Sequence, residues 1–105
     1  MNIRHVPSLM AFAAEKMQKH KVFETERFFC DVYCLLPGQA QKPHTHAAED
    51  KVYVVLAGVV TVTVGDEEQT LGHGMAALAP AGANHGVRNE SGAPASVLVF
   101  MAPHP

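Results

Sequence analysis

The sequence lacks tryptophan, has only two cysteines and contains no long apolar run. A helix that spans a bilayer needs about 20 consecutive, mostly apolar residues, so we expect no membrane partner. Charged residues are sparse, at 17% of the chain, and the formal net charge is −2. Lys and Arg form no basic cluster of the kind that binds a phosphate backbone, and we expect no nucleic-acid partner.

The two cysteines give no sign of a disulfide. Four residues apart on one strand, Cys30 and Cys34 would lie on the same face about 13 Å apart, which is too far for a bond to each other. Reduced thiols are typical of the cytoplasm. The first residues carry few charges, and Pro7 interrupts their short apolar stretch, so they do not resemble a signal peptide. A cytoplasmic protein is therefore expected.

The sequence does contain many short β-branched and apolar runs, separated by Gly and Pro. A chain of 105 residues is long enough for one domain with one core. The polar residues 39–42 are predicted as a loop. Strands are predicted at residues 17–23, 27–36, 51–56, 59–64, 68–71, 75–79, 85–88 and 96–101. A total of eight or nine short strands without a long helix predicts an all-β sandwich or barrel.

The N-terminal residues differ from this pattern. Ser8 is a candidate N-cap for one or two helical turns that would end near Ala14, with Leu9 and Phe12 on one face. The strand that follows would lie at a sheet edge. We divide the chain into an N-terminal segment with this helix and edge strand, residues 1–26, a barrel, residues 27–102, and a tail, residues 103–105.

Three histidines are candidate metal ligands. His44 and His46 lie two residues apart, so both imidazoles point to one side of an extended backbone. His85 follows a turn that contains Pro and Gly. Neutral imidazole suits Zn, Cu, Fe and Ni, and also Mn when oxygen ligands are present. The three side chains can meet only if the strands beside them are neighbours, which their spacing alone does not establish.

The first two histidines belong to a spaced motif. Gly38 is followed by five residues, His44, one residue and His46, then four residues to Lys51 and six more to Gly58. The chain resembles the cupin superfamily, whose first motif has this spacing: Gly, five residues, His-x-His, three or four residues, Glu, six residues, Gly. The one departure is Lys51 at the position of the Glu.

The third histidine belongs to a second motif. Gly74 is followed by five residues, Pro80, one residue and Gly82, then two residues to His85 and three more to Asn89. This agrees at every position with the second cupin motif, which is Gly, five residues, Pro-x-Gly, two residues, His, three residues, Asn. Two motifs with correct spacing are a specific match, unlike a single His-x-His.

The resemblance implies a double-stranded β-helix, the jelly-roll or RmlC-like barrel. It implies that His44, His46 and His85 project into this barrel and hold a divalent transition metal: Zn, Fe, Mn, Ni or Cu. It also implies a small-molecule ligand and a homodimer. Residues 9–14 and the strand near 17–23 are the expected dimer contacts, because an exposed sheet edge can pair with a second copy.

Lys51 leaves the fourth ligand open, because a protonated lysine has no lone pair. Water could complete a shell of three histidines, which we favour. Glu49 or Asp50 could supply a carboxylate through a bulge, although a regular strand turns Asp50 outward. The site could instead lack metal, with Lys51 as an anion contact or general base. Tyr53 lies on the same face as Lys51 and is a candidate substrate contact or catalytic group.

Three kinds of function are compatible with these residues. The first is a metal-dependent enzyme of the dioxygenase, isomerase or lyase class that acts on a small organic substrate. The second is a non-catalytic barrel that binds a small molecule or anion, with Lys51 and Arg88 as charge partners. The third is a metal-stabilised dimer without a ligand. Cupins include several chemistries, so the fold does not choose between these functions.

Overall fold

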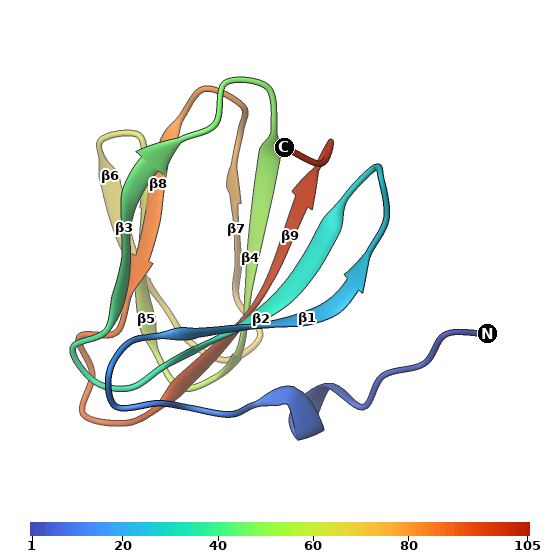
Figure 1. Ribbon diagram of the computed structural model, residues 1–105. Coiled ribbons are helices and arrows are strands. Elements are labelled where there is room, and N and C mark those ends of the chain that lie inside the picture. The colour runs from blue at the N-terminus through green and yellow to red at the C-terminus, as the bar shows by residue number, and fades with distance from the viewer.

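Nine strands and one short 3-10 helix make up the protein in the computed structural model, which describes all of residues 1–105 (Figure 1). No helix is long and apolar enough to span a membrane. The elements, in chain order, are η1 (Val6–Leu9), β1 (Gln18–Glu24), β2 (Phe29–Leu35), β3 (Ala40–Thr45), β4 (Asp50–Ala57), β5 (Val60–Val64), β6 (Glu67–Leu71), β7 (Ala76–Ala79), β8 (Asn84–Arg88) and β9 (Ala95–Ala102).

The strands form two antiparallel sheets that face each other across the core. One sheet has the order β1-β2-β9-β4-β7, and the other has the order β3-β8-β5-β6 (Figure 1). Several neighbours in each sheet are far apart in the sequence, as β2 and β9 or β3 and β8 illustrate. The all-β double-stranded β-helix predicted from the sequence is confirmed, and so is the short N-terminal helical turn.

Strand β3 corrects one prediction, because residues 40–42 belong to a strand and not to a loop. This strand lies at the edge of its sheet and pairs only with β8. Its side chains are exposed or half-buried, so it lacks the apolar alternation by which a strand is recognised. The pairing register shifts between Gln41 and His44, where Pro43 has no N–H to donate to the ladder.

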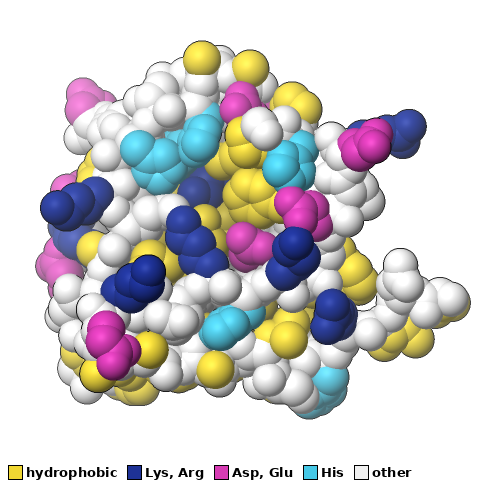
Figure 2. All heavy atoms as spheres, viewed as in Figure 1, with side chains coloured by type: hydrophobic (Ala, Val, Ile, Leu, Met, Phe, Trp, Pro, Cys, Tyr) yellow, Lys and Arg dark blue, Asp and Glu magenta, His cyan; other side chains and the backbone are white.

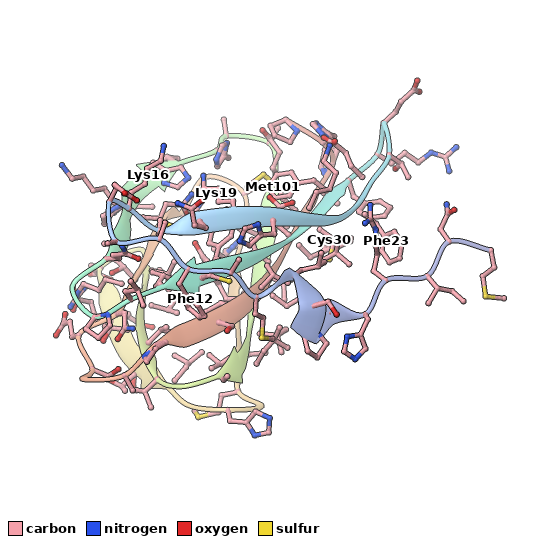
Figure 3. The ribbon with its side chains drawn as sticks, turned by 60° about the horizontal axis from the view of Figure 1, so that its bottom comes forward. Phe12, Lys16, Lys19, Phe23, Cys30 and Met101 are labelled. Atoms are coloured by element: carbon pink, nitrogen blue, oxygen red, sulfur yellow. The ribbon has the colours of Figure 1, made fainter.

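The helical turn is displaced from its predicted position, which began at Ser8. The observed 3-10 turn begins at Val6, and the Ser8 N–H donates to the His5 carbonyl at 3.0 Å. Pro7 explains the shift, because its fixed φ suits the first turn of a helix. In Figure 3 the N-terminal segment runs along the outside of the five-stranded sheet and then turns back into β1.

This segment covers the outer face of the sheet. Val22, Val32 and Cys34 form a small buried cluster there, against which Leu9 and Met10 pack. Strand β2 is therefore covered on both faces, and its four residues from Val32 to Leu35 are all buried. Covering of both faces explains why Asp31 is the only charged residue of this strand. Both cysteines are free thiols.

The main core fills the barrel between the two sheets. Twelve buried residues form it, and six of them are valines. Most of the twelve come from the inward faces of β2, β4, β5 and β9. Alternation is clear in β4, where Lys51, Tyr53 and Val55 are buried and the residues between them are half-exposed. Lys51 thus carries an ammonium group into a mostly apolar interior, at an inward position of a strand that is paired on both sides.

Candidate metal centre

Pairing between β3 and β8 brings the three histidines together. His44 lies directly opposite His85 in this ladder, and His46 follows one residue after β3 ends. One ligand nitrogen from each ring lies within 4.8 Å of the other two. The ring centroids of His44 and His85 are 4.5 Å apart, and those of His46 and His85 are 5.4 Å apart. The strand adjacency that spacing alone could not establish is present.

Backbone carbonyls orient two of the rings. Nδ1 of His44 lies 2.9 Å from the Lys42 carbonyl oxygen, and Nδ1 of His85 lies 3.1 Å from that of Ala83. A carbonyl only accepts, so each Nδ1 carries the proton and each Nε2 keeps its lone pair. Nε2 of His85 is buried and has no hydrogen-bond partner. Metal-binding histidines are held in this way, with the second nitrogen fixed by a neighbouring acceptor.

Burial keeps these rings neutral. Together with the smaller effect of the nearby Lys51 charge, it lowers the pKa of His85 to about 4. Burial also lowers the pKa of His44. An imidazole must be unprotonated to bind a metal, so both rings are in the ligating form at neutral pH. The donor set, three neutral imidazoles with one buried and unsatisfied nitrogen, fits a divalent transition metal.

The two carboxylates proposed as alternative ligands lie in different places. Asp50 is exposed, and its Oδ1 accepts a hydrogen bond of 2.8 Å from the Ala81 backbone N–H. Glu49 lies beside the site, with Oε1 at 3.8 Å from Nδ1 of His46. Neither carboxylate belongs to the histidine cluster. Asp50 instead ties the β7–β8 turn to the loop that carries His46.

Lys51 faces the histidines from the opposite sheet. Its side chain is 1% exposed, and Nζ donates a hydrogen bond of 3.0 Å to Oε1 of Gln41. Nζ also lies 5.3 Å from the ring centroids of both Tyr33 and Tyr53. No carboxylate forms an ion pair with it. Burial lowers the pKa of Lys51 to about 8, and the charge of Lys19 acts in the same direction.

Tyr53 lies near both the lysine and His85. Its ring centroid is 6.4 Å from that of His85. Its hydroxyl is buried without a hydrogen-bond partner, and burial raises its pKa. Tyr33 differs, because its hydroxyl lies 3.4 Å from Nε2 of Gln41. In Figure 2, histidine, basic and acidic side chains surround apolar side chains on one face of the molecule.

Comparison with known families agrees with the fold and with this constellation. A family model described as a cupin domain matches residues 31–101. The chain is a cupin. The match begins within β2 and ends at Met101 in β9, and it therefore includes all three histidines and Lys51.

Solved structures of several organisms share the whole cupin fold. TT1209 from Thermus thermophilus is 56% identical, with a TM-score of 0.97 and complete coverage of both chains, 100% of each. An RmlC-like cupin protein from Desulfovibrio desulfuricans is 27% identical, covers 98% of this chain and 97% of that one, and has a TM-score of 0.86. KdgF from a Halomonas species is 25% identical, with coverage of 87% and 82% and a TM-score of 0.78. A comparison with curated protein sequences gave no significant match.

Arg88 does not belong to the interior of this cupin, which corrects its prediction as a charge partner there. Its guanidinium forms ion pairs with Glu68 and Glu90 on the outside of the barrel. His85 and Arg88 are three residues apart in β8, so strand alternation sends their side chains to opposite faces. The odd spacing of His85 and Arg88 in the sequence could therefore have predicted that Arg88 faces outward.

Two residues beside the site escaped the sequence analysis. Gln41 was assigned to a loop, although in β3 it reaches both Lys51 and Tyr33. Gly86 was not singled out. A Cβ there would lie 2.9 Å from the Gln41 carbonyl oxygen and 2.9 Å from the Pro43 nitrogen, so only glycine lets β3 approach β8 this closely. Its position next to His85 was the feature of the sequence that could have drawn attention to Gly86.

Proposed function

We propose that this cupin binds a divalent transition metal through His44, His46 and His85 and acts as a metal-dependent enzyme on a small organic molecule. Two observations support it. Nε2 of His85 is buried without a hydrogen-bond partner, and one nitrogen from each of the three rings lies within 4.8 Å of the other two. Such a metal would supply Lewis-acid or redox chemistry at its open positions, in the dioxygenase, isomerase or lyase class.

We further propose that no carboxylate completes the ligand set and that water does so. Asp50 is held by the Ala81 N–H, and Lys51 has no lone pair while protonated. Glu49 has a different role in this proposal. Its position near Nδ1 of His46 lets it orient that ring, in the way that the carbonyls orient His44 and His85.

Metal content tests the proposal directly. Protein purified without chelator and without a His tag should contain close to one equivalent of Fe, Mn, Ni, Cu or Zn by inductively coupled plasma mass spectrometry. A His44→Ala/His85→Ala double variant should lose it. His73→Ala is the matched control, because this histidine lies outside the cluster. Absence of metal from the wild type, even after reloading with each ion, would refute the proposal.

A non-catalytic barrel that binds an anion is the second candidate, and Lys51 favours it. A buried ammonium without a counter-ion is costly, and a bound anion would offset that cost. Turnover separates the two functions. An enzyme should consume a substrate, or O₂ in the case of a dioxygenase. A binding module should instead show a raised melting temperature with a metabolite and no reaction.

We also propose a cytoplasmic homodimer. Strand β1 lies at a sheet edge, and the N-terminus extends away from the barrel with Met1 and Ile3 largely exposed (Figure 1). Phe12 and Phe23 are partly exposed on the same side (Figure 3). A second copy could cover these groups. Light scattering should give a mass of twice 11.3 kDa, and a mass of one chain would overturn the dimer. The two free thiols suit a reducing compartment.

A further inference from the structure

Polar groups with unused hydrogen-bonding capacity enter the barrel from both sheets. His85 Nε2 comes from the four-stranded sheet, whereas Tyr53 Oη and Lys51 Nζ come from the five-stranded sheet. Lys51 donates one hydrogen bond, to Gln41, and has no ion pair. Buried polar groups are ordinarily satisfied, so three groups with unused hydrogen-bonding capacity in one interior point to a ligand that satisfies them.

We propose that Lys51 and Tyr53 form a subsite for a carboxylate, so that the molecule bound beside the histidines is a small organic carboxylate. The proposal rests on the function proposed above, because it names the chemical class of the ligand at the same site. Lys51 would donate its two remaining N–H groups, and Tyr53 its hydroxyl. The ammonium group would form charge-assisted hydrogen bonds, and the buried hydroxyl would add a neutral one. Donors of these kinds bind carboxylates strongly.

The balance of charge around Lys51 favours an anion. The charges that act on its ammonium group are those of Lys19 and Asp31. Lys21, the other cation near Asp31, is paired with Glu24. Together Lys51, the exposed Lys19 and the half-buried Asp31 carry one net positive charge before any metal is bound. A carboxylate ligand would neutralise it in an interior where an uncompensated charge is costly.

The small number of donors favours a carboxylate over a phosphate. A carboxylate has two oxygens, and the N–H groups of Lys51 with the hydroxyl of Tyr53 can satisfy them. A phosphate has more oxygens and up to two charges, and it is usually held by arginine or by a series of backbone N–H groups. No arginine faces the interior, since Arg88 is paired outside and the other two arginines are exposed.

A cleft lies at the seam between the sheets, beside the residues that contact the proposed subsite. It has a volume of about 550 Å³ and lies between the start of β1 and β3. Lys16, Lys19 and Gln41 contribute to its lining, and Figure 3 shows both lysines at the start of β1. Gln41 also accepts the hydrogen bond from Lys51, so one side chain lines the cleft and contacts the proposed subsite. Two lysines in the lining of a cleft attract anions.

Binding of propionate tests the subsite with a small probe. We would titrate it into isotope-labelled protein near neutral pH, in a buffer free of carboxylate, and follow amide chemical shifts. Propionamide has nearly the same shape without the charge, and inorganic phosphate is the competing anion. Lys51→Met should weaken propionate binding at least about tenfold, the size expected for losing a charge-assisted hydrogen bond. Tyr53→Phe, which removes only the hydroxyl, should weaken it by about fivefold.

Lys21→Met is the control variant, because it removes the same charge from an exposed residue already paired with Glu24, and it should leave propionate affinity unchanged. Propionamide should bind wild-type protein at least about tenfold more weakly than propionate. Three results would overturn the subsite: equal propionate affinity in wild type and Lys51→Met, equal affinity for propionamide, or a preference for phosphate that depends on Lys51. Lack of propionate binding to the wild type would also overturn it.

Each titration would be run on metal-free and on metal-loaded protein, with metal content measured in every sample. Lys51→Met and Tyr53→Phe should retain the metal of the wild type. If the wild type binds metal but the Lys51 variant binds propionate normally, only the subsite fails. If the wild type binds propionate but no metal, and Lys51→Met weakens the propionate binding, the subsite stands and the metal centre fails.

Discussion

Replacement of Lys51 by methionine should stabilise the metal-free protein. Methionine has a similar length and no charge, so it fills the same space without the cost of burying an ammonium. The pKa of Lys51 falls from 10.5 to about 8 on folding, mainly because of burial. At about 1.4 kcal/mol for each tenfold change in the proton equilibrium, this corresponds to about 3 kcal/mol of lost stability at neutral pH. Gln41 is half-buried, so water can replace the hydrogen bond that it loses.

The pH dependence provides the sharper form of this prediction. Because the folded pKa is lowered, the unfolded chain binds the proton of Lys51 more readily between about pH 8 and pH 10.5. The wild type therefore bears the full cost below this window and regains stability as the pH rises through it. The difference in unfolding free energy between Lys51→Met and wild type should shrink by about 2 kcal/mol from about pH 7 to pH 10.

Urea unfolding followed by far-ultraviolet circular dichroism measures this difference, in a buffer with chelator so that no metal adds to the repulsion. The two tyrosines of the unfolded chain titrate in the same alkaline range, but they are present in both proteins and their contribution cancels in the comparison. A difference that stays constant from neutral to alkaline pH, whatever its sign, would refute the reasoning. It would mean that the buried ammonium is already compensated in the folded protein.

Three further predictions concern the histidines and their supports. Metal-free protein should lose about 2 kcal/mol of unfolding free energy from about pH 7 to pH 5. The pKa of His85 is lowered to about 4 in the folded protein, so the unfolded chain takes up the proton first. His85→Asn should flatten this pH dependence in urea unfolding at acid pH. Gly86→Ala should cost about 2 kcal/mol in urea unfolding and weaken metal binding, because its Cβ meets the β3 backbone, whereas Gly72→Ala has open space and should change little. Asn89→Ala should cost about 3 kcal/mol by the same assay, because this buried side chain makes four hydrogen bonds that hold the loop after β8. A cost below about 1 kcal/mol would show that water replaces these hydrogen bonds.

The sequence was most informative where local pattern and burial agree. A β-branched and aromatic run predicted β4, and a spacing of two residues placed Lys51 and Tyr53 on one face; the structure buries both. The two spaced motifs predicted that three histidines would meet, and they do. Spacing could not supply the register that sets His44 opposite His85, because that register depends on contacts between strands far apart in the sequence.

Other features depended on tertiary structure. Strand β3 is polar because it lies at a sheet edge, and a polar edge strand cannot be distinguished from a loop by hydropathy. The depth of Lys51 was hidden for a related reason. A lysine near the start of a strand ordinarily lies at the rim in water, whereas here Tyr33 and Gln41, from two other strands, enclose it.

Strand β3 contributes His44 and leads directly into His46, yet it is held by a single neighbour. A strand paired on one side opens more readily than a central one, so local opening of β3 would remove two of the three ligands at once. A metal bound to His44, His46 and His85 would link β3 to β8 and slow the opening of β3. The exchange of β3 amide hydrogens with solvent would then report how much of the protein is loaded, without any need to know the substrate.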